Sequence, residues 1–372
     1  MFQPNNLIKV SSFVAFALAL SCNNKTQQSN VIEINGNIKG LTAKMAYITD
    51  NYPIDSKPFD SCKIVNGTFS FKFKPDTVFS PRLVYISYND PKFTMIGVND
   101  PYAPKDGKPH RYGDFILERG ITELTGDFSK DKGVDIKTGT QNDFYFKNYD
   151  LPFAGVSKDS VKHKAQVNAI ITKIKEMPDS YWAAFAVNNL KFSVTKAEMT
   201  RMFNAFDQQT RQAYYGKKIK SFLADKLDEN ALKPNALLTD DKNNRVKLID
   251  STKKVNMVVF WASWCGPCRL EIPTLKKLAA KYKNTNLRMV SVSIDKDKTQ
   301  WKQALDVEKM QWQQLCIDNN DLPKLTSQYN LGWIPQVYLI DNNRKIIKHV
   351  DGFDPANEAV FDKTIADALK TN

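Results

Sequence analysis

The sequence reads MVVFWASWCGPCRLEIP from residue 257 to residue 273, and this stretch decides the fold of the C-terminal part of the chain. Its first five residues form a short continuous apolar run, which is typical of a buried central strand. Beyond the stretch, Leu275 and Leu278 continue from Ile272 at helical spacing. The two cysteines, Cys265 and Cys268, therefore lie where a buried strand passes into a helix.

This placement gives the two cysteines different chemistry. Cys265 lies at the helix N-terminus, where unpaired backbone N–H groups and the helix dipole stabilise a thiolate, the nucleophilic form of cysteine. Cys268 lies one turn further on the same face, so it can attack a mixed disulfide formed at Cys265. Pro267 fits the first turn because its missing N–H would be unpaired there. We predict a redox-active dithiol that needs no cofactor.

Other uses of a C-x-x-C pair fit less well. Covalent haem attachment needs histidine directly after the second cysteine, where this chain has Arg269. A zinc site needs further ligands, but Cys62 and Cys316 lack metal-type spacing and the three histidines are scattered. We therefore predict no metal. An inert structural disulfide stays open as an alternative, although a strand–helix junction is an unusual place for one.

The segment FWASWCGPCR (residues 260–269) resembles the active site of the thioredoxin superfamily. The following LEIP (residues 270–273) resembles the TlpA/ResA-like exported thiol–disulfide oxidoreductases in particular, and GWIPQVYLID (residues 332–341) resembles the second conserved element of the same family. The resemblance covers residues 233–372. It implies an α/β thioredoxin-like domain with thiol–disulfide oxidoreductase activity.

The resemblance also assigns roles to individual residues. It implies that Pro335 follows a cis peptide bond and packs opposite the cysteines, and that the backbone of Ile334 pairs with bound substrate. Trp264 and Trp333 would flank the substrate groove, where Gly266 and Pro267 would also meet the substrate. The plainer alternatives are core tryptophans and an ordinary proline at a strand start.

Two positions at which members of the superfamily carry an acidic residue distinguish this chain. Thioredoxins proper carry a buried aspartate two residues before the strand tryptophan, and here that position is Val259. Glu271, three residues after Cys268, corresponds to the acid typical of the TlpA/ResA-like group, and we count it among the catalytic residues. Its alternative is an ordinary solvated glutamate on a helix.

The N-terminus has the pattern of an export signal. Lys9 precedes an apolar stretch, residues 10–20, that is too short to span a bilayer but suits a signal peptide. Ala19-Leu20-Ser21-Cys22 resembles a bacterial lipobox, although Ala19 stands where the strongest motifs have leucine. We predict a signal peptide over residues 1–21, lipidation of Cys22 and a polar tether over residues 22–30. A conventional signal peptide with an incidental cysteine is the alternative.

Two further regions precede the thioredoxin-like segment, over residues 31–142 and 143–232. The first has short alternating runs and an Asn66-Gly67 hairpin signal, which predicts an antiparallel β-sandwich or barrel. The second has helical periodicity and is predicted to be a helical connector. Within it, Thr195 and Glu198 form a predicted capping box. Both regions look like the N-terminal part that accompanies such thioredoxin modules in envelope lipoproteins.

Charge and the remaining cysteines add little chemistry. The chain has 53 basic and 40 acidic residues, for a net charge of +13, but the lysines are spread along it without a compact basic block. We therefore predict no nucleic-acid partner. Cys62 and Cys316 are predicted to be buried and unpaired. A disulfide joining them is the alternative.

These features together predict a lipid-anchored protein of the bacterial cell envelope, facing the periplasm. Its expected reaction is reduction of disulfides in exported proteins through Cys265 and Cys268, with electrons from an upstream thiol donor. The same cysteines could instead act as a disulfide oxidase or isomerase, because direction depends on reduction potential. A ligand-binding lipoprotein with a secondary thioredoxin module is the alternative from another functional class.

Overall fold

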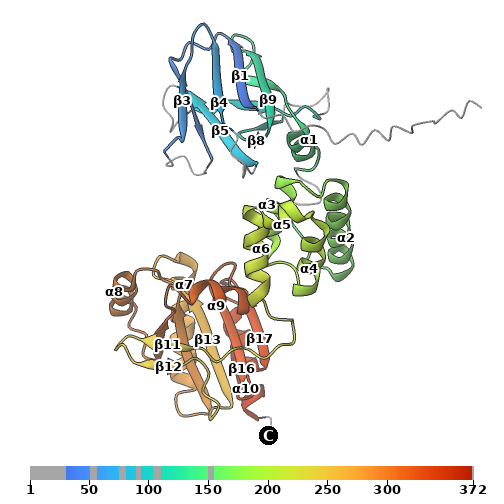
Figure 1. The fold of residues 1–372 in the computed structure, drawn as a ribbon. Helices are drawn as coiled ribbons and strands as arrows, with labels where there is room; N and C mark the ends of the chain where they lie inside the picture. The colour runs from blue at the N-terminus through green and yellow to red at the C-terminus, as the bar shows by residue number, and fades with distance from the viewer. Residues whose placement is uncertain are drawn as a thin grey trace, which may run out of the picture.

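The computed structural model describes residues 31–50, 57–74, 81–88, 94–103, 110–149 and 155–370. Within these ranges a β-rich part, a group of helices and an α/β part follow one another along the chain and in space (Figure 1). The predicted signal peptide and tether, including Cys22, lie outside the described residues. No helix in the described ranges is both long enough and apolar enough to cross a bilayer.

The N-terminal part consists of two β-sheets, as predicted. One has the strand order β4-β1-β9-β10-β6-β7 and the other β3-β2-β5-β8. Side chains of β1 alternate between core and surface, with Ile32, Ile34 and Ile38 fully buried. The strands are β1 (Ile32–Lys39), β2 (Met45–Thr49), β3 (Asp60–Lys63), β4 (Thr68–Phe73), β5 (Arg82–Tyr88), β6 (Gly97–Asn99), β7 (Arg111–Tyr112), β8 (Phe115–Leu117), β9 (Gly120–Asp127) and β10 (Gly133–Lys137).

The pairing of these strands differs from the prediction because it is not antiparallel throughout. β1 pairs in parallel with β9, with Ile32 opposite Gly120, and β6 pairs in parallel with β10. Parallel neighbours need a long crossover connection. The chain between β1 and β9 supplies that connection. It forms all four strands of the second sheet, β2, β3, β5 and β8, and also adds β4, β6 and β7 to the first sheet on the way.

The predicted turn at Asn66-Gly67 is confirmed. The prediction that its two flanking strands pair with each other as a hairpin is wrong. Both residues have positive φ, 50° and 78°, and Val65 and Thr68 exchange two backbone hydrogen bonds of 2.9 Å. A side chain at Gly67 would meet the Ile38 carbonyl oxygen at 2.2 Å, so glycine is required. The flanking strands diverge beyond the turn. β3 joins β2 and β4 joins β1, so the turn connects the two sheets.

The helical connector shares its hydrophobic core with the β-rich part, and one continuous buried cluster runs from Ile32 to Ile219. The Asn142 side chain bonds both the N–H and the carbonyl of Ile116 on β8, each at 2.6 Å. The rings of Tyr145 and Trp182 pack edge to face, 4.8 Å apart. The helices are α1 (Thr140–Lys147), α2 (Ser160–Glu176), α3 (Tyr181–Leu190), α4 (Lys196–Ala205), α5 (Gln208–Gln212) and α6 (Tyr214–Asp225).

The predicted capping box begins α4. The Thr195 hydroxyl accepts a hydrogen bond from the Glu198 N–H at 3.1 Å, and the Glu198 carboxylate accepts one from the Thr195 N–H at 2.9 Å. The same carboxylate lies 3.0 Å from Nε2 of His163 on α2. The cap therefore also joins two helices of the connector.

The C-terminal part is an α/β domain built on one seven-stranded sheet of order β12-β11-β15-β14-β13-β16-β17. β13 runs parallel to β14 and antiparallel to β16, which gives the mixed central sheet of a thioredoxin-like fold, as predicted. The strands are β11 (Leu237–Asp240), β12 (Arg245–Lys247), β13 (Val255–Trp261), β14 (Leu287–Ser293), β15 (Gln313–Cys316), β16 (Gln336–Asp341) and β17 (Ile346–Asp351). The helices are α7 (Gly266–Lys281), α8 (Lys298–Glu308), α9 (Leu322–Gln328) and α10 (Asn357–Lys370).

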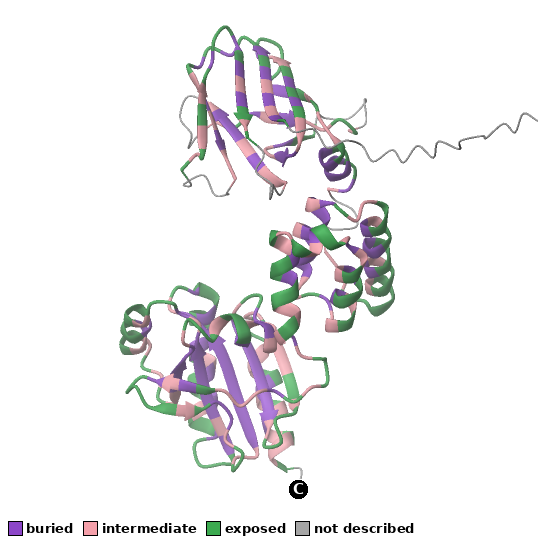
Figure 2. Ribbon diagram, viewed as in Figure 1, coloured by how far each residue is buried: buried purple, intermediate pink, exposed green. Residues whose placement is uncertain are grey.

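Helices cover both faces of this sheet, and every residue of β13 is buried (Figure 2). Val258 and Phe260 point into the core that includes residues of α9. Met257 and Val259 point into the opposite core, which includes residues of α7 and α10. Packing on both sides thus fixes the position of β13, and the cysteines follow directly from its C-terminal end.

Thr195→Ala should lower the free energy of unfolding by about 1 kcal/mol, because the first turn of α4 loses its side-chain cap. Urea unfolding of the full chain measures the change. Thr200→Ala is the matched control, since Thr200 lies within the same helix, is exposed and donates its hydroxyl to the Lys196 carbonyl in the preceding turn. Equal stabilities of the two variants would contradict a capping role.

Candidate active site

The β13–α7 junction places Cys265 at the start of a helix. Cys265 is the N-cap residue of α7, and its sulfur accepts a hydrogen bond from the backbone N–H of Cys268 at 3.2 Å. Pro267 occupies the first turn, where its missing N–H costs no helical bond. The helix N-terminus therefore directs both an N–H donor and its dipole at the Cys265 sulfur, an arrangement that favours a thiolate in the reduced protein.

The two cysteines form a disulfide, with their Cα atoms 5.3 Å apart. Both are almost fully buried, whereas the neighbouring Trp264 is 66% exposed. Gly266 and Pro267 between the cysteines are exposed as well. A reaction partner can therefore reach the disulfide from the side on which these residues face solvent.

A second segment, residues 333–335 directly before β16, lies next to the disulfide. The peptide bond between Ile334 and Pro335 is cis, as the resemblance implied. The carbonyl oxygen of Ile334 lies 3.8 Å from the Cys265 sulfur, and Trp333 before it is 45% exposed. The structure thus brings Ile334, which lies between Trp333 and Pro335, next to Cys265, about seventy residues away in the chain.

Glu271 is not a solvated helix residue. Its side chain is 1% exposed, and neither carboxylate oxygen has a hydrogen-bond partner among the described residues. Burial raises the pKa of this carboxyl from 4.5 to about 7. Because Glu271 follows Cys268 by three residues on α7, it lies on the face of the helix that carries Cys268. A buried carboxyl with such a pKa can take up or release a proton near neutral pH.

Asp295 is a buried carboxylate that the sequence analysis missed. It accepts hydrogen bonds from the N–H and the hydroxyl of Ser263, at 2.9 and 2.7 Å, and from the Ser293 hydroxyl at 2.6 Å. These bonds tie the loop before Cys265 to the end of β14. The sequence offered one signal for this role. Asp295 follows a predicted buried strand, whose end lies at the same edge of the sheet as the cysteines.

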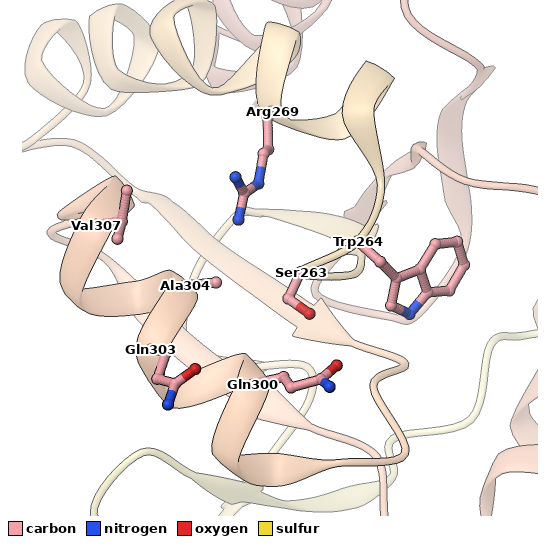
Figure 3. Close-up of a pocket in the computed structure, with 7 residues that line it drawn as sticks. All are labelled: Ser263, Trp264, Arg269, Gln300, Gln303, Ala304 and Val307. Carbon is pink, nitrogen blue, oxygen red and sulfur yellow. The ribbon is translucent and has the colours of Figure 1, made fainter.

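A pocket of about 380 Å³ opens beside the cysteines, between the start of α7 and α8 (Figure 3). Trp264 and Ser263 line it on one side, and Arg269 of α7 and residues of α8 line the rest. The Arg269 guanidinium is paired with Glu308 at 3.5 Å. The residues from α8 are Gln300, Gln303, Ala304 and Val307.

The other two described cysteines are not part of the exposed site. Cys62 and Cys316 are both free, so they do not form the alternative disulfide. Cys316 is fully buried in the same cluster as Cys265 and Cys268, while Cys62 is partly buried. Burial raises the pKa of the Cys316 thiol to about 11, which keeps it protonated and unreactive at neutral pH. Among the described residues, no three His, Cys, Asp or Glu side chains are grouped as metal ligands.

The fold and this site define a thioredoxin-like protein with a reactive cysteine pair opposite a cis-proline. Residues 215–368 match the Redoxin family, and residues 32–145 match a domain described as Domain of unknown function (DUF4369). The thiol-disulfide oxidoreductase ResA of Geobacillus kaustophilus is 30% identical over 124 residues, which are 32% of this chain and 67% of that protein. ResA of Bacillus anthracis is 27% identical over 119 residues, again 67% of its length.

Solved structures give related matches. A putative thiol:disulfide interchange protein DsbE from Chlorobium tepidum is 31% identical and covers 38% of this chain and 99% of its own, with a TM-score of 0.35. The thioredoxin domain of a thiol-disulfide oxidoreductase from Bacteroides vulgatus is 26% identical, covers 39% of this chain and 99% of its own, and has the same TM-score. The chain belongs to the redoxin family and is a thiol–disulfide oxidoreductase related to ResA.

Glu271→Gln should stabilise the oxidised protein more at pH 8 than at pH 5. A carboxyl that titrates near 4.5 when unfolded and near 7 when folded binds more protons in the folded state between those values. Wild-type stability therefore falls as the pH rises through this window, by up to about 3 kcal/mol from this group. Glu271→Gln cannot ionise at this position, so its free energy of unfolding does not fall in this way.

Urea unfolding of both proteins from pH 4 to 8 measures the difference between them. A constant difference across this range would show that Glu271 titrates normally. Glu308→Gln is the matched control, because Glu308 is a glutamate near the same site that is paired with Arg269.

Proposed function

We propose that this oxidoreductase reduces disulfides in exported polypeptides. The observation that carries the proposal is the Cys265 sulfur at the start of α7, 3.8 Å from the carbonyl of Ile334 beside the cis-proline. In such an arrangement the backbone of Ile334 can pair with the backbone of a bound polypeptide while its disulfide meets Cys265. Exposed Trp264 and Trp333 provide apolar surface beside the reacting sulfurs.

The proposed reaction has two exchange steps. The Cys265 thiolate attacks the substrate disulfide, forms a mixed disulfide and releases the first substrate thiolate. Cys268 then loses its proton and attacks the Cys265 sulfur, which releases the second thiolate and leaves the Cys265–Cys268 disulfide. Two electrons pass to the substrate, and an upstream thiol donor must return them before the next cycle.

Glu271 supports both the second step and the reducing direction. A buried carboxyl with a pKa of about 7 can accept the Cys268 proton when that thiol becomes a nucleophile. Once ionised, it disfavours a nearby thiolate, which makes the reduced pair less stable and a better electron donor. A disulfide oxidase would need the opposite, a stabilised reduced pair. The equilibrium reduction potential of the pair tests the direction: a value near that of thioredoxin supports a reductase, and one near that of DsbA contradicts it.

We further propose that the protein acts at the bacterial cell envelope, facing the periplasm and anchored by lipid on Cys22. This proposal is supported by the short apolar segment, the residues before Cys22 and the polar tether after it. Such a location would expose the active site to exported proteins.

Cys268→Ser should accumulate mixed disulfides through Cys265 in cells, because the resolving thiol is missing. Cys265→Ser should abolish turnover and trap no partners, because the attacking thiolate is gone. Non-reducing electrophoresis followed by identification of the trapped proteins checks both variants. Capture of partners through Cys268 in the Cys265→Ser protein would contradict the assigned roles. Trapped partners without export signals would contradict the proposed substrates.

Cys22→Ala should release the protein from the membrane fraction into the soluble periplasmic fraction, because lipid on Cys22 is the proposed anchor. Fractionation after a high-salt wash measures the change, and Cys62→Ala serves as the cysteine control. Sedimentation of the Cys22→Ala protein with membranes at the wild-type level would remove the support for lipidation.

A further inference from the structure

We propose that the helical connector positions the cis-proline loop, residues 330–335, for binding of polypeptide substrates. Parts of the chain outside the redox domain would thereby set how well a protein disulfide is bound. The inference rests on the proposed function, in which the backbone of this loop pairs with the substrate. It gives a role to residues that contact neither cysteine.

The first contact is made by Lys226, which directly follows α6. Its side chain is 6% exposed, and its ammonium group donates hydrogen bonds to the carbonyl of Lys191 at 3.1 Å and to Oδ1 of Asn330 at 2.9 Å. Lys191 caps α3, so Lys226 joins two elements of the connector to the redox domain. The ammonium group also lies over the Phe222 ring, 5.2 Å from its centroid. Breaking the two hydrogen bonds would leave a buried charge without these oxygens, so the protein favours the geometry in which both are made.

Asn330 completes the contact from the other side. Its amide nitrogen donates to the carbonyl of Phe192 at 2.8 Å, so both ends of its side chain bond the connector. Its backbone has a φ of 55°, and its own carbonyl accepts bonds from the Gly332 N–H at 2.9 Å and the Gln336 amide at 3.2 Å. The residue that bonds the connector is therefore also the residue that shapes the start of the loop.

Packing reinforces these hydrogen bonds. The ring of Phe192 lies so close to Gly332 that a Cβ there would meet it at 2.6 Å. Phe192 packs edge to face on Phe222 of α6, with ring centroids 5.1 Å apart. The hydroxyl of Ser327, a 2% exposed residue of α9, donates to the Phe222 carbonyl at 2.7 Å. The connector thus contacts the loop itself and the helix before it.

The opposite end of the same loop meets the disulfide. Two residues separate Gly332, which contacts Phe192, from Pro335, and Ile334 between them lies against Cys265. A shift of Asn330 or Gly332 would therefore move the backbone groups of Ile334. A polypeptide that pairs with this backbone should be sensitive to such a shift, whereas a small disulfide that touches only the sulfurs should not.

Two variants of the full chain remove the contact from its two sides. Lys226→Met removes the ammonium group and keeps an unbranched apolar chain. Asn330→Gly removes the side-chain bonds and tolerates positive φ. Both should lower kcat/KM for insulin reduction between about three- and tenfold, mainly through KM. Reduction of the small disulfide 5,5′-dithiobis(2-nitrobenzoic acid) should change by less than about twofold.

Matched controls make the same substitutions elsewhere in the domain. Lys254→Met removes a lysine whose ammonium group donates to the carbonyl of Leu369, near the C-terminal end of the domain. Asn243→Gly changes an exposed asparagine with a φ of 67° in the turn between β11 and β12. Both controls should keep wild-type rates with both substrates. The double variant Lys226→Met/Asn330→Gly should lose less insulin activity than the product of the two single losses, because the two residues share the Lys226–Asn330 hydrogen bond.

Hydrogen exchange of the backbone amides of residues 331–334, 336 and 337 gives a readout that does not depend on the substrate. Exchange there should rise in Lys226→Met and Asn330→Gly and stay unchanged in the controls. Unchanged exchange, or equal losses with insulin and the small disulfide, would overturn the positioning role. If wild-type protein reduces the small disulfide but not insulin, the proposed function fails, and this inference fails with it.

Discussion

The burial of β13 on both faces is the constraint on which the active site depends. Alternate side chains of this strand enter two separate cores, so the strand can neither slide nor rotate without exposing one of them. Cys265 follows four residues after the strand ends, and Asp295 holds the intervening loop through Ser263. The packing of β13 and the Asp295 carboxylate together therefore fix the position of the Cys265 sulfur at the start of α7.

Two buried carboxyls serve the site in opposite ways. Asp295 has its negative charge met by three hydrogen-bond donors, and this makes it a fixed support for the backbone. Glu271 has no such donors among the described residues, so its charge is costly and its proton is retained up to about neutral pH. The same functional group can thus be structural or reactive, depending on whether the protein supplies hydrogen bonds to the charged carboxylate.

The sequence predicted the parts of the site that depend on local patterns. A continuous apolar run, a C-x-x-C pair and helical spacing located the strand–helix junction, and the resemblance supplied the cis-proline. The sequence analysis missed Asp295, Lys226 and Asn330 because their roles depend on contacts that are distant in sequence. Ser263 and Asp295 are 32 positions apart, Lys226 and Asn330 are 104 positions apart, and such contacts leave no periodic signal. The Asn66-Gly67 turn illustrates the same limit. Its backbone conformation is local and was predicted, whereas the choice of partner strands is not local and was wrong.

The continuous core from Ile32 to Ile219 has a consequence for how the molecule comes apart. The β-rich part and the helices look like two bodies in Figure 1, yet they share one set of buried side chains, whereas the redox domain has cores of its own. Heat or denaturant should therefore divide the chain into two cooperative units, which meet near Lys226. A cut between the sheets and the helices would split a core, but a cut after α6 would fall between separate cores.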